Sequence, residues 1–272
     1  MSALIEGLNP QQIAAVKHES SPLLVVAGAG SGKTRVLTRR IAYLLAQRNV
    51  APYEVLAITF TNKAAGEMKE RVAQLVGDRA KAMWVSTFHS ACVRILRKEA
   101  SLLGYTNSFT IYDQSDSLRL ITLVMRDLNL DTKRYAPRAV AALISQAKNE
   151  LMGPADYLNQ GKDQFQEIVA QVFSIYQKRL SGANSMDFDD LISKTVEVLQ
   201  RHPETRAKYR SRFKHILVDE YQDTNHAQYV LIKELVGTAS DSFALAELCV
   251  VGDADQSIYA FRGANIRNIL QF

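Results

Sequence analysis

The sequence predicts an α/β fold in which helices flank a parallel β-sheet and an all-helical subdomain is inserted. Short apolar runs alternate with helical stretches towards both ends of the chain. Continuous apolar character, rather than strict alternation, is typical of strands covered on both faces. From about residue 105 to about residue 184 helical periodicity takes over, with almost no strand signal. We therefore expect the α/β domain in two parts, 1–104 and 185–272, around a helical subdomain at 105–184.

The individual elements follow from the same patterns. The expected strands are five apolar runs, Leu23–Gly28, Val55–Phe60, Met83–Phe88, His215–Glu220 and Leu248–Asp253. Apolar residues at helical spacing predict helices over Gly32–Gln47, Asn62–Val76 and Ser90–Leu103. Strand–helix–strand alternation of this kind favours a parallel sheet with right-handed crossovers.

The composition is that of an ordinary globular protein, with 47% hydrophobic and 22% charged residues among 272. No apolar run reaches the ~18–20 residues of a membrane helix, and the N-terminus lacks a secretory pattern. We therefore expect a cytoplasmic location and no membrane partner. Two cysteines build no disulfide framework, and the five histidines form no zinc-ligand spacing with them. A net charge of +5 would attract a polyanion without identifying it.

The stretch Val25–Leu37 (VVAGAGSGKTRVL) has the pattern of a phosphate-binding loop between a strand and a helix. Such a loop needs glycines where the backbone turns against the anion, a lysine for the β- and γ-phosphates, and a hydroxyl for Mg²⁺. Lys33 and Thr34 supply the last two groups. Ala27 stands where the strict pattern has its first glycine, and the alternative is a glycine-rich turn that binds nothing. We expect a site for ATP and Mg²⁺.

A pair of carboxylates, Asp219 and Glu220, ends the apolar run in ILVDEYQDTN. In phosphate-loop enzymes such an aspartate holds Mg²⁺, and a neighbouring glutamate can polarise the attacking water. Two adjacent carboxylates at the end of a buried strand are unfavourable without a nearby cation. A solvated acidic turn is the alternative for the Asp-Glu pair alone. Together with Lys33, the pair indicates nucleotide hydrolysis.

The chain resembles the UvrD/PcrA/Rep group of superfamily 1 DNA helicases from Leu8 to Phe272. The resemblance rests on seven stretches in the order of the family's motifs: LNPQQIAAV, AGAGSGKTR, ITFTNKAAGEMKERV, VSTFHSACVRILR, MDFDDLI, VDEYQDTN and VGDADQSIYAFRGA. The family form of the phosphate loop also begins with alanine. The resemblance implies a RecA-like P-loop domain with a helical insertion.

The resemblance also implies the roles of the ATP-site residues. Gln12 would hydrogen-bond the adenine, Arg35 would pack beside the base or ribose, and Gln256 would sense the γ-phosphate. The implied ATP-binding set is Gln12, Ala27, Gly28, Ala29, Gly30, Ser31, Gly32, Lys33, Thr34 and Arg35. The implied catalytic set is Lys33, Asp219, Glu220 and Gln256, with Thr34 and Asp219 as ligands of Mg²⁺.

Single-stranded DNA is the second ligand that the resemblance implies. The residues along its path would be Thr59, Phe60, Asn62, Ser86, Thr87, His89, Tyr259, Phe261 and Arg262. Aromatic platforms bind unpaired bases without reading them, at ~1–3 kcal/mol per stacked base. The family often has tryptophan at the position of Phe261, which offers less area. Without the resemblance, Phe60, Tyr259 and Phe261 would be assigned to the core.

Taken together, the resemblance implies an ATP-dependent 3′–5′ DNA helicase and translocase that acts in repair or replication restart. Its substrates would be single-stranded DNA and single/double-strand junctions. In the helical insertion, Arg134, Lys148 and Lys178 could touch phosphate, although lysines on helix faces are usually just solvated.

The family carries a second RecA-like domain after the position of Phe272. Because arginines from that domain would complete the ATP site, we expect the chain alone to hydrolyse ATP poorly and not to unwind DNA. The alternatives are the motor of a helicase–nuclease, a non-catalytic nucleotide-gated DNA-binding module, and a small-molecule kinase.

Overall fold

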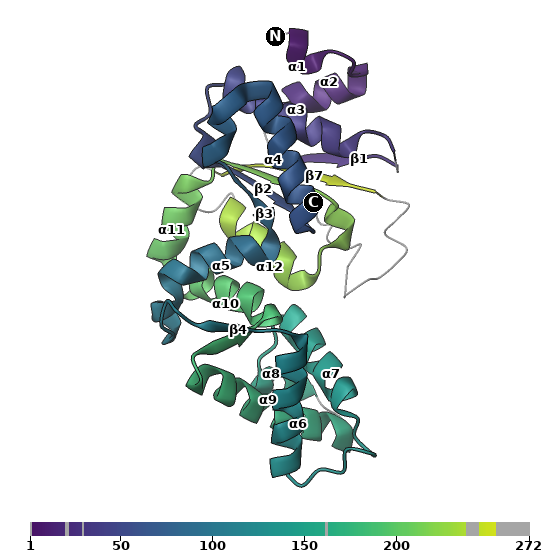
Figure 1. Cartoon of the computed structure of the whole chain (residues 1–272), viewed down its shortest axis with the longest axis vertical. Helices are drawn as coiled ribbons and strands as arrows, with labels where there is room; N and C mark the ends of the chain where they lie inside the picture. The colour runs from purple at the N-terminus through teal and green to yellow at the C-terminus, as the bar shows by residue number, and fades with distance from the viewer. Residues whose placement is uncertain (1, 20–21, 29, 161–162, 238–244, 254–272) are drawn as a thin grey trace. The chain divides into compact units, whose positions relative to one another are not determined.

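The computed structural model describes residues 2–19, 22–28, 30–160, 163–237 and 245–253, and Figure 1 shows its course. The chain divides into two compact units. The first unit contains the described residues of 1–91, 202–224 and 232–253, and the second contains residues 92–201 and 225–231.

A five-stranded parallel sheet with the strand order β1-β7-β6-β2-β3 forms the centre of the first unit. The strands are β1 (Leu23–Val26), β2 (Val55–Thr59), β3 (Trp84–Thr87), β6 (His215–Val218) and β7 (Glu247–Gly252). All five expected runs form strands, and each strand ends one or two residues before its run does. The predicted α/β fold with a parallel sheet is thus confirmed. The residues that follow the strands lie at the carboxyl edge of the sheet.

Two helices cover one face of this sheet, α3 (Lys33–Ala46) and α4 (Asn62–Val76). Alternate strand residues such as Ala57, Leu217 and Cys249 pack with Leu44 of α3 and Met68 of α4 in one buried core. The period of two follows from the strand geometry, which sends successive side chains to opposite faces. The remaining helices with residues in this unit are α1 (Ser2–Ile5), α2 (Pro10–Lys17), α5 (Phe88–Glu99), α11 (Pro203–Arg212) and α12 (His226–Val236).

Helix α2 packs on α3 and brings its first turn to the phosphate loop. It begins with a capping box, because the Asn9 side chain accepts from the Gln12 backbone N–H (2.8 Å) and the Gln12 side chain accepts from the Asn9 N–H (3.0 Å). Its end is fixed by Arg40, which is 2% exposed and donates to the carbonyls of Ala15 and His18, both at 2.9 Å.

The second unit is mainly helical. Its elements are β4 (Thr110–Tyr112), α6 (Gln114–Asp127), α7 (Pro137–Asn149), α8 (Pro154–Gln160), α9 (Gln164–Gly182), β5 (Ser185–Asp187) and α10 (Phe188–Arg201), with parts of α5 and α12. Buried side chains of α6, α7 and α9 form its core, among them Val124, Ile144 and Phe173. The short strands β4 and β5 pair in parallel and add a two-stranded ladder that the periodicity did not predict. Because α10 packs on α7 and β5, this unit is wider than the segment 105–184.

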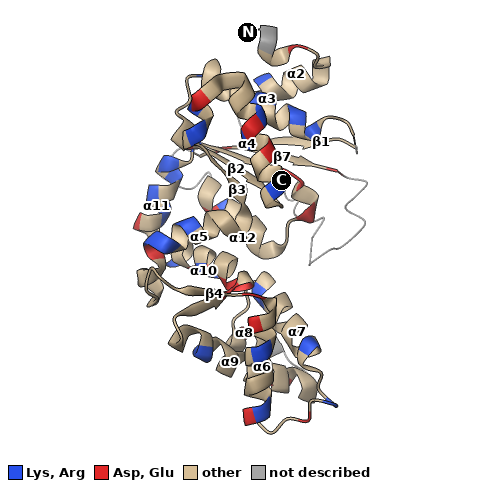
Figure 2. Cartoon of the chain, viewed as in Figure 1, with Lys and Arg blue, Asp and Glu red and all other residues tan. Residues whose placement is uncertain are grey.

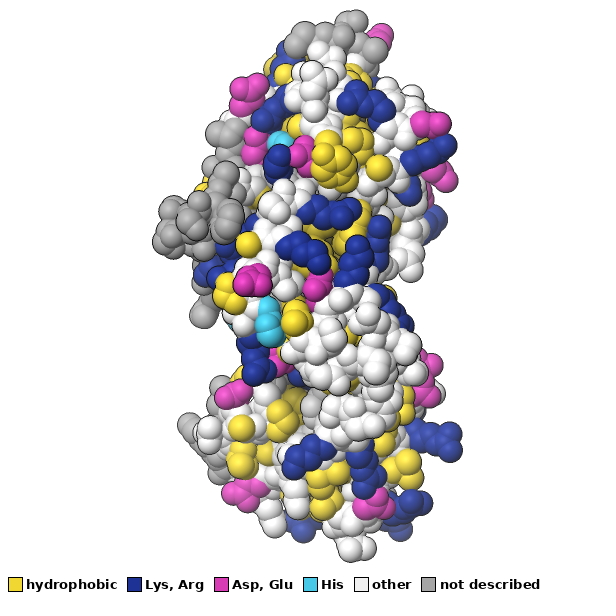
Figure 3. Space-filling model, turned by 90° about the vertical axis from the view of Figure 1, so that its left-hand side faces the viewer, with side chains coloured by type: hydrophobic (Ala, Val, Ile, Leu, Met, Phe, Trp, Pro, Cys, Tyr) yellow, Lys and Arg dark blue, Asp and Glu magenta, His cyan; other side chains and the backbone are white. Residues whose placement is uncertain are grey.

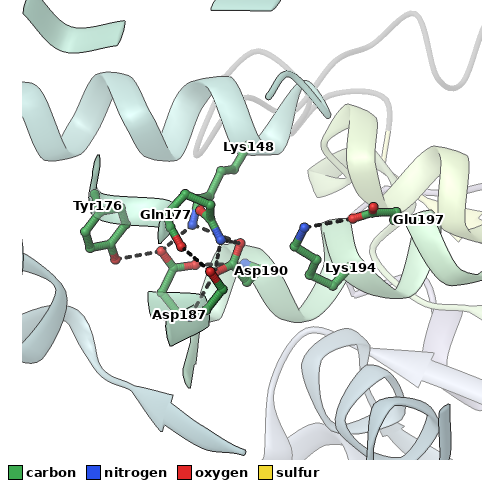
Figure 4. Close-up of polar contacts among 8 residues, drawn as sticks. Lys148, Tyr176, Gln177, Asp187, Asp190, Lys194 and Glu197 are labelled. Carbon is green, nitrogen blue, oxygen red and sulfur yellow. Dashed lines mark hydrogen bonds and ion pairs between the residues drawn. The ribbon is translucent and has the colours of Figure 1, made fainter. Parts of the chain in front are cut away.

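A buried ion cluster connects α7 to β5 and α10 in the second unit (Figure 4). Lys148 Nζ lies 2.6 Å from Asp187 Oδ2 and 2.9 Å from Asp190 Oδ1. Tyr176 donates to Asp187 (2.7 Å), and Gln177 donates to Asp190 (3.1 Å). Burial alone would lower the pKa of Lys148, but the two carboxylates outweigh it and raise that pKa. Lys148 is only 4% exposed, so the prediction that it could touch DNA phosphate is wrong.

Positive charge is distributed over both units rather than gathered on one element (Figure 2). On the face shown in Figure 3, basic and acidic side chains are interspersed with apolar ones. Helix α11 is rich in basic residues, yet Arg206 pairs with Glu234 (3.2 Å) and the Arg212 guanidinium lies 5.0 Å from the centre of the Trp84 ring. The net charge therefore does not locate a surface for a polyanion. No helix in the described part of the chain combines the length and apolar character needed to cross a membrane.

Candidate functional site

The candidate site lies at the carboxyl edge of the sheet, where β1, β7 and β6 are neighbours. Val26 is paired with Gly252, and Val250 is paired with Val218. The ladder continues one residue beyond β1, because the Ala27 N–H donates to the Gly252 carbonyl (3.1 Å). The phosphate loop, the acidic pair and the residue after β7 therefore leave the sheet side by side. Parallel α/β sheets bind ligands at this edge.

The phosphate loop makes the sharp turns that its glycines predict. Gly30 has φ +73° and Gly32 has φ +86°, conformations that favour glycine because a Cβ atom is strained there. The Ser31 hydroxyl donates to the Gly28 carbonyl (2.6 Å) and closes the loop on itself. Gly32 is also the residue before α3, and no side chain caps the first amides of that helix. Uncapped N–H groups at a helix N-terminus form a site for an anion such as phosphate.

Lys33 is the first residue of α3, and its side chain runs back under the loop. Its Nζ donates to Asp253 Oδ2 (2.8 Å) and to the Ala27 carbonyl (3.0 Å), and lies 3.5 Å from the Gly28 carbonyl. Lys33 is 9% exposed and Asp253 is 1% exposed, so the ion pair is buried. The ammonium group is therefore already held at the loop that would enclose a phosphate.

Thr34 and Asp219 provide the oxygen atoms that could hold Mg²⁺. Thr34 Oγ1 donates to Asp219 Oδ2 (3.4 Å). Burial, and next the charge of Glu220, raise the pKa of Asp219, whereas the Glu220 N–H, the Thr34 hydroxyl and Lys33 act in the opposite direction. A divalent cation would favour the ionised carboxylate. Mg²⁺ usually takes one or two protein carboxylates together with substrate phosphates and waters, and this pair fits that donor set.

Glu220 follows Asp219 in a left-handed backbone conformation, with φ +50° and ψ +44°. Its N–H donates to Asp219 Oδ1 (3.0 Å). Its carboxylate accepts a hydrogen bond of 2.7 Å from Gln222 Nε2. The Gln222 Oε1 atom accepts from the backbone N–H of Asp253 (3.0 Å). A non-glycine residue in the left-handed region is uncommon, and such outliers concentrate at functional sites.

Two residues predicted to contact the nucleoside lie beside the loop. Gln12 Nε2 donates to the Ser31 carbonyl (2.9 Å), which attaches α2 to the loop. Arg35 is exposed, and its guanidinium donates to the Glu6 carbonyl (3.3 Å). Gly7 has φ +69°, a conformation that favours glycine, and a Cβ atom there would meet only the flexible end of the Arg35 side chain. Gln12 is thus attached to the loop, and Arg35 lies on the first turn of α3, which follows the loop.

The predicted DNA residues of the described part lie at the ends of β2 and β3. They are Thr59, Phe60, Asn62, Ser86, Thr87 and His89. Thr59 is paired with Thr87 in the parallel ladder. On its other side β2 adjoins β6, where the Asp219 N–H donates to the Ile58 carbonyl (3.0 Å). These residues therefore follow directly along the edge that carries the acidic pair.

Several of these side chains are less accessible than a DNA contact requires. Thr59 is 1% exposed and donates to the Thr61 carbonyl (3.1 Å), and Thr87 is 8% exposed and donates to Ser90 Oγ (2.9 Å). Phe60 is half-buried and meets Phe88 edge-on at 5.6 Å between ring centres. The more accessible members are Asn62, which is exposed, and His89, which is half-buried.

Comparison with known proteins identifies the family. The sequence profile of the UvrD/REP helicase N-terminal domain matches residues 8–272. The chain belongs to this family. It is 62% identical over 274 residues to the ATP-dependent DNA helicase UvrD1 of Mycobacterium tuberculosis, covering 99% of this chain and 36% of that protein. It is 53% identical over 272 residues to the ATP-dependent DNA helicase PcrA of Staphylococcus aureus, and the match covers 100% of this chain and 36% of that protein.

The UvrD/REP family membership agrees with the RecA-like sheet described above. The chain spans 36% of the length of these relatives. Five predicted site residues lie outside the described residues: Ala29, Gln256, Tyr259, Phe261 and Arg262. Within the described part, no group of three or more His, Cys, Asp and Glu side chains forms a separate metal centre.

Sequence reasoning missed two residues of the site, Gln222 and Asp253. Both were visible in the motif stretches VDEYQDTN and VGDADQ, but neither was given a role. The available signal was positional, since Asp253 ends the last apolar run and Gln222 follows the acidic pair by two residues. What the pattern could not supply is the strand order, which makes β7 the neighbour of both β1 and β6.

Proposed function

We propose that the protein carrying this chain is an ATP-dependent 3′–5′ DNA helicase and translocase. We further propose that it acts on single-stranded DNA and single/double-strand junctions in repair or replication restart. The convergence of Lys33, Thr34, Asp219 and Glu220 on the loop at one sheet edge supports the ATP site. The names of the relatives, ATP-dependent DNA helicases, support the DNA substrate.

The described side chains would have separate roles in ATP hydrolysis. The loop amides and Lys33 would bind the phosphates, and Gln12, which contacts the loop at Ser31, would bind the adenine. Mg²⁺ on Thr34 and Asp219 would neutralise phosphate charge. Glu220 would accept a proton from the attacking water, since it lies beside Asp219 and is ionisable. Gln256 would couple the γ-phosphate to the DNA residues that follow it.

The path of the single-stranded DNA would run over the ends of strands β2 and β3. Asn62 and His89 are the accessible polar residues there, and Phe60 presents a half-buried ring beside them. Tyr259, Phe261 and Arg262 would add stacking surface and positive charge. Aromatic rings bind unpaired bases of any sequence, which suits a motor that moves along DNA.

We propose that the 272-residue chain binds Mg·ATP but does not unwind DNA by itself. A second RecA-like domain is the proposed partner that completes the ATP site. Loss of an arginine supplied from such a domain lowers phosphoryl transfer by about 10³–10⁵-fold. ATP-dependent strand displacement by residues 1–272 alone would refute this part of the proposal.

The test of the proposed function is a Glu220→Gln variant of the whole protein. We expect it to bind Mg·ATP like the wild type and to lose DNA-stimulated hydrolysis, because the amide cannot accept the proton. Glu70→Gln, an exposed change on α4, is the matched control. Wild-type turnover in Glu220→Gln would contradict the assigned role. Partial duplexes with a 3′ or a 5′ single-stranded tail then report the direction of movement.

A reducing, cytoplasmic compartment is our proposal for the location. Cys92 and Cys249 are both free and buried. Burial raises the pKa of Cys92 to about 12 and that of Cys249 to about 11. Both thiols therefore stay protonated and behave as small core residues.

A further inference from the structure

Gln222 occupies a central place between the acidic pair and the end of β7. It is 2% exposed, and both ends of its amide are used. Nε2 donates to Glu220 Oε2 (2.7 Å), and Oε1 accepts from the Asp253 N–H (3.0 Å). Asp253 in turn holds Lys33 Nζ at 2.8 Å. One amide therefore connects the carboxylate proposed to activate water with the lysine proposed to bind phosphate.

Gly252, the last residue of β7, leaves room for this amide. A Cβ atom on Gly252 would lie 3.2 Å from Gln222 Oε1 and 3.6 Å from its backbone nitrogen. Contacts of 3.2 Å are too close for a methyl group without a shift. The glycine next to Asp253 thus permits the amide to reach the Asp253 N–H.

Glu220 needs such a contact because its own backbone is strained. Its φ of +50° is a left-handed conformation in a residue that has a Cβ atom. Such conformations persist only where the surroundings fix them. The Asp219 carboxylate fixes the Glu220 N–H, and Gln222 fixes the Glu220 carboxylate.

We propose that Gln222 is a positioning residue that holds the Glu220 carboxylate in its working orientation and ties it to Lys33 through Asp253. The inference rests on the proposed ATPase function of the same site. A glutamine suits this task because its amide donates a hydrogen bond without neutralising the carboxylate. A lysine or arginine would bind Glu220 as an ion pair and weaken it as a base.

Two substitutions separate positioning from simple stability. Gln222→Leu removes both hydrogen bonds at nearly constant size. Gln222→Glu keeps an acceptor for the Asp253 N–H but places a second carboxylate against Glu220. Glu220 already lies close to two other carboxylates of its own segment, Asp219 and Asp223. The added carboxylate would repel Glu220 at the point where Gln222 donates a hydrogen bond to it.

The assay is ATP hydrolysis by the whole protein with saturating oligo-dT, measured as kcat and KM for Mg·ATP. For Gln222→Leu we expect kcat to fall by about 10–100-fold with KM for Mg·ATP nearly unchanged. For Gln222→Glu we expect kcat to fall at least as far, again with KM for Mg·ATP nearly unchanged, because a like charge replaces the hydrogen-bond donor to Glu220. Gln228→Glu is the matched control, because Gln228 is 7% exposed and caps α12 through the Asn225 N–H (3.0 Å).

The outcomes distinguish the inference from the function on which it rests. Wild-type kcat in Gln222→Leu or in Gln222→Glu would overturn the positioning role. An equal loss of kcat in Gln228→Glu would also overturn it, since the effect would then come from any added buried carboxylate. A wild-type protein without Mg-dependent ATP hydrolysis would instead defeat the proposed function. Thermal unfolding of each variant shows that the compared proteins are folded.

Discussion

Replacing Lys148 by methionine should destabilise the second unit strongly. Lys148 is 4% exposed and lies within hydrogen-bonding distance of two carboxylates, Asp187 and Asp190, whose side chains are 9% and 2% exposed. Methionine fills a similar volume but leaves both carboxylates buried without their cation. Tyr176 and Gln177 also donate to these carboxylates (Figure 4) and would be left as neutral donors in the variant.

The magnitude follows from the burial of the pair. Removing one partner of a buried ion pair costs about 3–5 kcal/mol, because the remaining charge is left in a medium of low dielectric constant. An exposed pair contributes about 0–1 kcal/mol. Lys194→Met provides the matched control, since Lys194 lies 2.7 Å from Glu197 with side-chain exposures of 23% and 30%. The two variants remove the same group and differ in burial.

Urea unfolding followed by circular dichroism measures both variants. At pH 8 we expect the free energy of unfolding to fall by about 3–5 kcal/mol in Lys148→Met and by less than about 1 kcal/mol in Lys194→Met. Burial raises the pKa of Asp187 and Lys148 opposes that effect, so without Lys148 this carboxyl should have a higher pKa and take up a proton as the pH falls towards 4. The difference between Lys148→Met and wild type should therefore shrink towards pH 4. A loss at pH 8 equal to that of Lys194→Met would refute the reasoning.

Two further substitutions test the pH dependence of stability and the backbone conformation of the phosphate loop, the second with a control in α4. Burial, together with the charge of Asp187, raises the pKa of Asp189 to about 6, so the stability this carboxyl contributes is present at low pH and lost as the pH rises through about 6. The free energy of unfolding of Asp189→Asn, measured with urea, should therefore rise relative to that of the wild type between pH 4 and pH 7. A difference between the two proteins that does not change with pH would contradict this. Gly32→Ala should lower the free energy of unfolding by about 1–2 kcal/mol, because φ at this residue is +86° and the new Cβ would lie 3.1 Å from Gln12 Nε2. Gly66→Ala within α4, where a Cβ meets nothing within 4 Å, should instead leave stability unchanged or raise it by up to about 1 kcal/mol.

Much of the fold was predictable because its elements carry strong local signals. The five strands are continuous apolar runs, and α4 spans Asn62–Val76 as its spacing predicted. The phosphate loop was equally clear, since glycines at Gly30 and Gly32 meet a real demand for positive φ. These features depend on residues close together in the chain.

The features that were missed depend on residues far apart in the chain. Lys148 has the sequence context of a solvated lysine on a helix face, and only the packing of α7 against β5 and α10 reveals its carboxylate partners. The link from Lys33 to Asp253 spans most of the chain, and it follows from a strand order that periodicity does not encode. The ladder of β4 and β5 joins two three-residue strands that are too short to show a period.

Binding of a non-hydrolysable ATP analogue to the 272-residue chain, measured by calorimetry with and without Mg²⁺, tests the central claim most directly. We predict saturable binding that requires Mg²⁺ and weakens at least about tenfold, or about 1.4 kcal/mol, in Lys33→Ala. Lys69→Ala, an exposed change on α4, should bind like the wild type. Equal affinity in wild type and Lys33→Ala, or binding indifferent to Mg²⁺, would contradict the nucleotide site at this edge of the sheet.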